Sequence, residues 1–247
     1  MTTAAETTVD DFLSGRVQVV QPVDGFRAGT DSVLLAASLP SNLQGEALDL
    51  GCGAGGALLP AAWRLPDAKF TGFEKNLPMA ALATEGVAIN NLEKRVRIVE
   101  GDVLHMPEDW ENRFDLVFSN PPFFDAGSIQ APAKGKTDAY LQSASLKQWL
   151  SAMLFATRPK GTIVLVHRAA ELARILSVLE RRVGEITVLP IRSFPGEDAK
   201  RVLIKARKGL RSGSMRLLAG LDLYEQRGGQ RSEILRDISS EGCGIDW

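Results

Sequence analysis

The stretch ALDLGCGAGG, residues 47–56, decides the fold of this 247-residue chain. Its first four residues read as a short buried strand, and the glycine-rich turn after them opens the apolar run ALLPAAWRL, which reads as a helix. Glycine lets a backbone turn tightly and approach a ligand without a Cβ in the way. A strand, a glycine turn and a helix in this order are typical of an open α/β sheet whose ligand lies at the carboxyl ends of the strands.

Strand-like and helix-like segments continue to alternate after this turn. Near-continuous apolar strands that alternate with amphipathic helices indicate a mostly parallel, doubly wound α/β sheet covered on both faces. The last two strand-like runs are joined by a loop too short for a crossover helix, so we expect an antiparallel strand at the edge of the sheet. The expected strands cover 47–50, 69–74, 96–102, 114–120, 161–167, 185–190 and 201–207.

The composition is that of an ordinary globular protein and limits the functions to consider. With 29 basic and 30 acidic side chains the net charge is −1, so a nucleic-acid surface would have to be a local patch. The two cysteines, Cys52 and Cys243, and the two histidines, His105 and His167, predict neither a disulfide framework nor a metal site. No apolar run suits a membrane span, and the polar first ten residues are unlike a signal peptide. We therefore expect a cytoplasmic protein.

The glycine turn by itself fits two kinds of cofactor. Gly51, Gly53 and Gly56 satisfy the dinucleotide fingerprint G-x-G-x-x-G, and Glu74 follows at the spacing of a ribose-binding acid. This pattern suits an NAD-type dinucleotide as well as S-adenosylmethionine. Asp49, directly before the first glycine, favours S-adenosylmethionine, because a carboxylate there attracts the positively charged amino acid end of that cofactor and repels a pyrophosphate.

A second acid supports the same cofactor. Asp102 and Val103 follow the third strand, where the carboxylate can accept a hydrogen bond from the adenine amine and the Val103 amide can donate to the ring. In an open α/β sheet these segments converge at the carboxyl ends of the strands. The candidate cofactor-binding residues are Thr30, Asp49, Gly51, Cys52, Gly53, Ala54, Gly55, Glu74, Lys75, Asp102, Val103 and Asn120.

The fourth strand ends in Asn120-Pro121-Pro122-Phe123, which we interpret as the catalytic motif. Consecutive prolines fix φ and lack backbone donors, so the carbonyls there can only accept hydrogen bonds. The Asn120 side-chain carbonyl and the Pro121 backbone carbonyl can then accept both hydrogens of one NH2 group, which aims the nitrogen lone pair at a sulfonium methyl. Phe123 offers an aromatic face to a planar acceptor, and such stacking contributes about 1–3 kcal/mol per base. A dehydrogenase that transfers a hydride would not require this motif.

The pattern DLGCGAG, Glu74, GD and NPPFF, spread over 49–124, resembles the amino-group branch of the class I methyltransferases. The segments QPVDGFRAGTDSVLLA (21–36) and LYE (223–225) are similar to a narrower group, the bacterial enzymes that methylate adenine N6 in the anticodon loop of valine tRNA. This resemblance covers most of the chain. It implies a seven-stranded sheet, with Glu74 on the cofactor ribose, Asp102 on its adenine and the Asn-Pro-Pro-Phe motif on the acceptor. Phe123 departs from the narrower group, which usually has Tyr.

The expected organisation is a flexible N-terminus followed by a single methyltransferase domain. A helix should begin near Asp31, capped by the side chain of Thr30 or Asp31. The tryptophans Trp63, Trp110 and Trp149 are interpreted as packing residues. The expected parts are a flexible segment over 1–16, a domain over 17–247, and within it an N-terminal extension packing on the cofactor side (17–45), a core (46–210) and a C-terminal appendage (211–247).

A basic run from Lys200 to Arg216 contains no acid. One interpretation is a track for an RNA backbone, since phosphate contacts dominate RNA affinity. The other is an edge strand that lysine and arginine protect against aggregation. The candidate RNA-binding residues are Lys134, Lys136, Lys205, Arg207, Lys208 and Arg211.

These observations predict an enzyme that transfers a methyl group from S-adenosylmethionine to an adenine N6 amine in structured RNA, with tRNA as the expected partner. Orientation and desolvation would supply most of the acceleration, because the sulfonium is already activated. Three alternatives stay open: a glutamine amide on a protein, guanine N2, and an RNA interaction protein that binds the cofactor without turnover. A titration of NADH against S-adenosylhomocysteine would test the remaining dehydrogenase interpretation.

Overall fold

The computed structural model describes residues 6–25, 27–122, 144–210 and 213–247. Its strands are β1 (Thr7–Phe12), β2 (Val17–Pro22), β3 (Glu46–Leu50), β4 (Lys69–Glu74), β5 (Val96–Glu100), β6 (Phe114–Ser119), β7 (Thr157–Arg168), β8 (Val183–Arg192), β9 (Arg201–Lys208), β10 (Arg216–Leu217) and β11 (Leu221–Asp222). Its α-helices are α1 (Thr30–Ala37), α2 (Leu58–Arg64), α3 (Leu77–Ile89), α5 (Leu146–Ala156), α6 (Leu172–Leu179) and α7 (Glu233–Arg236). Among these described helices, none has the length and apolar character needed to cross a membrane.

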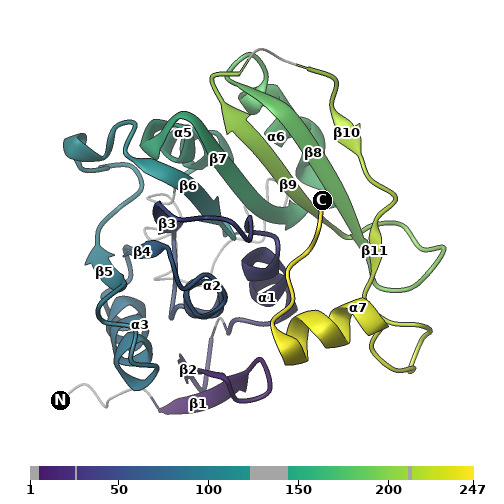
Figure 1. Cartoon of the computed structure of the whole chain (residues 1–247), viewed down its shortest axis with the longest axis horizontal. Coiled ribbons are helices and arrows are strands. Elements are labelled where there is room, and N and C mark those ends of the chain that lie inside the picture. Colours follow the sequence, from purple (N-terminus) through teal and green to yellow (C-terminus); the bar gives the residue numbers. More distant parts are fainter. Residues whose placement is uncertain (1–5, 26, 123–143, 211–212) are drawn as a thin grey trace, which may run out of the picture.

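Nine strands form one sheet in the order β10-β8-β9-β7-β6-β3-β4-β5, with β11 also paired to β8 (Figure 1). Neighbours from β5 through β4, β3 and β6 to β7 are parallel. The chain runs outwards from β3 through β4 to β5, and then crosses back to β6 on the other side of β3. The carboxyl ends of β3 and β6 therefore mark the point where the strand order reverses, which is where such a sheet binds its ligand. The expected doubly wound α/β sheet is confirmed.

The antiparallel strand does not lie at the edge of the sheet. β9 pairs antiparallel with both β7 and β8 and fills the space between them, and the short strands β10 and β11 extend β8 further. The strands from β3 to β9 match the seven that were expected. A hairpin can join a sheet through either of its strands, and hydrophobicity does not distinguish the two. The expected antiparallel pairing of the last two strands is confirmed, but the antiparallel strand, β9, lies inside the sheet and not at its edge.

Strand residues alternate between two apolar layers. On β3, Ala47 packs in the layer that contains α1, α2 and α3, and Leu48 packs in the layer that contains α5 and α6. Leu116 and Val117 alternate in the same way on β6. A sheet covered by helices on both faces requires this alternation of two apolar faces. The two layers, visible on either side of the sheet in Figure 1, fix the strands whose ends carry the site.

The N-terminal segment is a two-stranded hairpin, not the flexible segment expected over 1–16. β1 pairs antiparallel with β2 from Thr7↔Pro22 to Phe12↔Val17, and β2 contacts α2 and α3. Residues 1–5 lie outside the described residues, so the correction applies from β1 onwards. β1 alternates exposed and half-buried residues with no apolar stripe, and Leu13 in the turn takes a positive φ of 50°. No hydrophobic pattern therefore predicts this hairpin.

The C-terminal residues close over α1. The Ile245 amide donates to the Ala37 carbonyl at 2.7 Å, and Trp247 Nε1 donates to the Ser38 carbonyl at 2.9 Å. These bonds satisfy carbonyls at the end of α1 that have no partner within the helix. Lys205 on β9 contacts Trp247 as well, with its ammonium 4.6 Å from the ring centroid. Ile245 and Trp247 thus connect the end of α1 to β9 of the sheet.

Candidate active site

The carboxyl ends of β3, β4, β5 and β6 surround a cavity of about 760 Å³. This volume suits a small-molecule cofactor. The cavity is lined by the ends of the four strands that the sequence singles out, and also by Trp149 of α5 and by Ala144, two residues before that helix. Its lining residues are Gly51, Gly53, Phe73, Glu74, Lys75, Asn76, Met79, Gly101, Asp102, Val103, Asn120, Pro121, Pro122, Ala144 and Trp149.

The glycine loop is held by hydrogen bonds to the neighbouring strand. The Gly51 and Cys52 amides donate to the Phe73 carbonyl at 2.8 and 3.2 Å, and the Gly53 amide donates to Glu74 Oε2 at 2.8 Å. Gly51 and Gly53 take φ values of 77° and 55°, a conformation that favours glycine. Beyond its chain neighbours, no described atom lies within 4 Å of the position that a Cβ on Gly53 would take. This face of the loop is therefore open to a ligand.

Glu74 is oriented by the backbone around it. Its Oε2 accepts from the Gly53 amide and its Oε1 accepts from the Asn76 amide, each at 2.8 Å. Asn76 also caps α3, because its side chain accepts from the Met79 amide at 3.2 Å. A carboxylate offers about four acceptor positions, so these two bonds leave others for the hydroxyls of a ribose.

Asp102 is held by two donors from different segments. The Leu104 amide donates to Oδ1 at 3.0 Å, and the Lys75 ammonium lies 2.7 Å from Oδ2. Burial raises the pKa of Asp102, but the Leu104 amide and the Lys75 ammonium outweigh it and leave the pKa below its ordinary value. The carboxylate is therefore charged at neutral pH, the form that accepts a hydrogen bond from an adenine amine. Direct contact between Lys75 and a cofactor stays a prediction.

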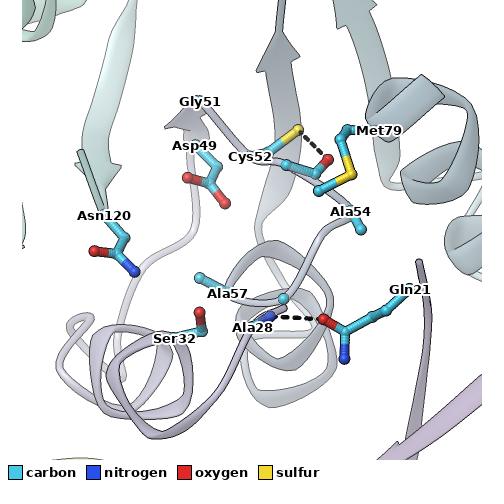
Figure 2. Close-up of a pocket in the computed structure, with 12 residues that line it drawn as sticks. Gln21, Ala28, Ser32, Asp49, Gly51, Cys52, Ala54, Ala57, Met79 and Asn120 are labelled. Carbon is cyan, nitrogen blue, oxygen red and sulfur yellow. Dashed lines mark hydrogen bonds between the residues drawn. The ribbon is translucent and has the colours of Figure 1, made fainter. Parts of the chain in front are cut away.

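Asp49 differs from the other two acids because it is both buried and unsatisfied. It is 2% exposed, and Oδ2 has no hydrogen-bond partner among the described residues. Burial, and then the negative charge of Glu74, raise the pKa of Asp49 well above its ordinary value. Figure 2 shows its carboxylate beside the same small space as the Asn120 amide and the Ser32 hydroxyl. A buried carboxylate needs a cation to complete it, so this position fits the ammonium of S-adenosylmethionine.

The N-terminal segment forms one wall of this smaller space, a cavity of about 40 Å³. Gln21 on β2 is 1% exposed; its Oε1 accepts from the Ala28 amide at 2.6 Å and its Nε2 donates to Asp10 Oδ2 at 2.6 Å. Gln21 was not among the predicted site residues, although it stands at the end of an apolar run and begins the segment 21–36 that carries the resemblance. The lining residues are Gln21, Ala28, Ser32, Asp49, Gly51, Cys52, Gly53, Ala54, Gly56, Ala57, Met79 and Asn120.

Two of the predicted cofactor residues lie elsewhere. Among the described residues that line the two cavities, neither Thr30 nor Gly55 occurs. Thr30 is exposed and begins α1 after Gly29, with no side-chain capping bond. Asp31, the other expected cap, pairs with Arg201 on β9 at 2.9 Å. The expected capping is therefore wrong: no side chain caps α1, and the Asp31 carboxylate pairs with Arg201 instead.

The predicted acceptor motif begins at the junction of the two cavities. Asn120, Pro121 and Pro122 follow β6 and line the large cavity, and Asn120 lines the small one as well. Phe123, the predicted stacking residue, lies outside the described residues. Trp149 was expected to be a packing residue, but it lines the large cavity too. A tryptophan in an amphipathic helix looks like a core residue, and only the tertiary structure brings it to the strand ends.

Two of the predicted RNA-binding cations of β9, Arg207 and Lys208, lie towards the opposite end of the sheet from Asn120, whereas Lys205 pairs with Val164, level with Phe118. Because β9 is antiparallel to β7, Lys208 Nζ donates to the Thr157 carbonyl at the start of β7, at 2.7 Å. Arg207 donates to the Lys160 carbonyl at 2.9 Å, and Lys205 donates to a backbone carbonyl at 2.5 Å. The edge-protection interpretation is wrong, since β9 is an interior strand, and RNA binding by these three cations stays a prediction. Lys134, Lys136 and Arg211 lie outside the described residues.

Comparisons with known proteins point to one enzyme class. A family model described as "Methyltransferase small domain" matches residues 25–140. The chain is 30% identical over 207 residues to a tRNA1(Val) (adenine(37)-N6)-methyltransferase of Porphyromonas gingivalis, a match covering 80% of this chain and 81% of the relative. A predicted O-methyltransferase from Agrobacterium tumefaciens has the same fold, with a TM-score of 0.72, 24% identity and coverage of 87% and 98% of the two chains. TYW2 of M. jannaschii, in complex with AdoMet (S-adenosylmethionine), matches with a TM-score of 0.59, 13% identity and coverage of 84% and 88%.

Proposed function

This chain belongs to the family of the tRNA1(Val) (adenine(37)-N6)-methyltransferases, and we propose that it methylates the N6 amine of an adenine in tRNA. S-adenosylmethionine is its cofactor. The observation that carries the proposal is the position of Asn120, which lines the large cavity with Asp102 and the small cavity with Asp49. An amine bound by Asn120 would therefore meet the methyl donor at the strand ends. A cytoplasmic location, where tRNA is found, is part of the same proposal.

In this proposal, three acids each bind a different part of the cofactor. Asp49 holds the ammonium of the amino acid end, Glu74 accepts hydrogen bonds from the ribose hydroxyls, and Asp102 accepts one from the adenine amine. The Gly53 side of the glycine loop lets the cofactor approach the backbone closely. Bound in this way, the cofactor supplies a methyl group that a positively charged sulfur already activates.

Asn120 and Pro121 prepare the acceptor nitrogen. The Asn120 side-chain carbonyl and the Pro121 backbone carbonyl each accept one hydrogen of the NH2 group, which draws the nitrogen lone pair out of conjugation with the ring. In the transfer, the amine held by Asn120 and Pro121 would form its bond to the methyl carbon while the carbon–sulfur bond breaks and the electron pair goes to the sulfur. One N–H proton then leaves to solvent. The alkylated nitrogen loses this proton readily, so the chain needs to provide orientation and exclusion of water, without a strong base.

Labelled cofactor tests the proposal directly. The protein is incubated with methyl-labelled S-adenosylmethionine and, separately, total tRNA, ribosomal RNA and a protein fraction. We expect label in the tRNA fraction, and N6-methyladenosine after digestion to nucleosides. Label in N2-methylguanosine, label on protein glutamine, or tight binding of S-adenosylhomocysteine with no labelled product would each refute the proposal in favour of one named alternative.

A further inference from the structure

The two strands that carry the site separate just where it begins. The β3–β6 ladder ends at Asp49↔Phe118. Beyond that pair the glycine loop turns towards β4, because the Gly51 amide donates to the Phe73 carbonyl, while β6 continues to Asn120. The cofactor loop and the acceptor motif therefore have no backbone ladder between them at the level of the site.

A buried side chain bridges this gap. Ser119 Oγ donates to the Leu50 carbonyl at 2.6 Å and accepts a hydrogen bond from Trp149 Nε1 at 2.9 Å. Ser119 is fully buried and Trp149 is 9% exposed. Leu50 and Ser119 would be the next pair in the β3–β6 register, so the hydroxyl stands in for the missing backbone bond. Two hydrogen bonds in series thus join β3, β6 and α5.

The Trp149 ring also supports the cofactor loop. A Cβ on Gly51 would lie 2.6 Å from Trp149 Cζ2, so the ring packs directly against the Gly51 backbone. The same ring lines the large cavity together with Asn120. One side chain therefore contacts the loop through its ring and holds the end of β6 through its N–H.

We propose that Ser119 and Trp149 are positioning residues that set the separation between the glycine loop and Asn120. The inference rests on the proposed function, because it concerns the alignment of an acceptor amine with a methyl donor. The rate of such a transfer depends steeply on geometry, and a misplacement of about 1 Å can lower it about a hundredfold. A purely structural bridge would affect stability and leave the transfer step unchanged.

Two variants and one matched control separate these roles. Ser119→Ala removes the bridge without adding volume, and Trp149→Phe keeps a ring but removes the indole N–H. Ser38→Ala is the control, because Ser38 is also fully buried and its hydroxyl donates to the Leu35 carbonyl at 2.7 Å, at the far end of α1. Each protein is measured for its Tm, its Kd for S-adenosylhomocysteine, and its single-turnover rate with total tRNA at saturating cofactor.

We expect Ser119→Ala and Trp149→Phe each to slow the single-turnover step by about tenfold or more, with the Kd within about threefold of the parent. The double variant should be no slower than the slower single variant, because both changes break the same series of bonds. Ser38→Ala should lower the Tm but keep the parental rate. A parental rate in Ser119→Ala, with a lowered Tm, would overturn the inference. If the parent itself methylates no RNA, the proposed function fails, and the inference falls with it.

Discussion

Replacing Asp49 by Asn should raise the thermal stability of the cofactor-free protein and lower its affinity for the cofactor. Asp49 is almost fully buried, and its Oδ2 has no partner among the described residues. Burial and then the charge of Glu74 raise the pKa of Asp49 well above its ordinary value. A group whose pKa is raised on folding contributes stability that is fully present below its unfolded pKa and is lost as the pH rises through its folded pKa. Ionisation of Asp49 therefore destabilises the protein without cofactor, and this effect grows as the pH rises through the folded pKa.

The loss of this one carboxylate determines both the change in Tm and the change in cofactor affinity. Replacing the buried carboxylate by a neutral amide removes a buried charge, which should relieve about 1–3 kcal/mol, and for a domain of this size each kcal/mol raises the Tm by roughly 2–4 °C. The same substitution removes the partner of the cofactor ammonium. A hydrogen bond to a charged group contributes about 1.5–3 kcal/mol, so the Kd for S-adenosylhomocysteine should rise by about ten- to a hundredfold.

Glu74→Gln is the matched control for Asp49→Asn. Glu74 lines the same cavity, but both of its oxygens accept backbone amides, so its replacement should weaken cofactor binding and also lower the Tm. Thermal melts of the cofactor-free proteins and calorimetry with S-adenosylhomocysteine measure both quantities. The Tm gain of Asp49→Asn should shrink as the pH falls, because protonation makes the parental carboxyl neutral. A lower Tm with an unchanged Kd would refute this reasoning.

Three further predictions test the acceptor side and the cations. Asn120→Ala should lower kcat by at least about a hundredfold, near 2.7 kcal/mol, with S-adenosylhomocysteine affinity within a few-fold; a parental single-turnover rate would make the motif a structural turn. Phe123→Tyr should keep the parental rate and RNA affinity, because the stacking face of the ring remains. Neutralising Lys205, Arg207 and Lys208 together should lower the Tm, since their nitrogens donate to the chain's own carbonyls. If these cations also form the predicted RNA track, the salt dependence of RNA binding should become flatter, and an unchanged salt dependence would refute the track.

The residues at the strand ends could be predicted because the local sequence marks where each strand ends and the parallel topology brings those ends to one edge of the sheet. Gly51, Glu74, Asp102 and Asn120 each lie at or just after the end of a short apolar run, and such runs alternate with helical stretches. Parallel strands connected through helices end at one edge of the sheet. Residues far apart in the sequence are therefore brought to one cavity without any knowledge of how side chains pack.

Other parts of the site depend on packing that the sequence does not reveal. Trp149 reaches Ser119 across 30 positions, and its place in an amphipathic helix gives no reason to expect a hydrogen bond at the strand ends. Gln21 reaches the site through a hairpin whose first strand has no apolar stripe. Arg207 and Lys208 bond to carbonyls near the start of β7 because β9 is inserted antiparallel, and hydrophobic patterning does not predict which strand of the hairpin pairs with β7.

The different surroundings of the three acids also determine which cofactor the site can accept. Backbone amides donate to both oxygens of Glu74 and the Lys75 ammonium balances Asp102, but Oδ2 of Asp49 has neither kind of partner within the described part of the chain. The Glu74 charge already raises the pKa of Asp49, so the potential beside the glycine loop is negative. A pyrophosphate placed there would add negative charge to a water-poor region, whereas an ammonium would complete the one unsatisfied carboxylate. We therefore expect calorimetry to detect binding of S-adenosylhomocysteine and none of NADH under the same conditions. Comparable affinity for NADH would contradict the role assigned to Asp49. Asp49→Asn should reduce the difference in affinity between S-adenosylhomocysteine and NADH.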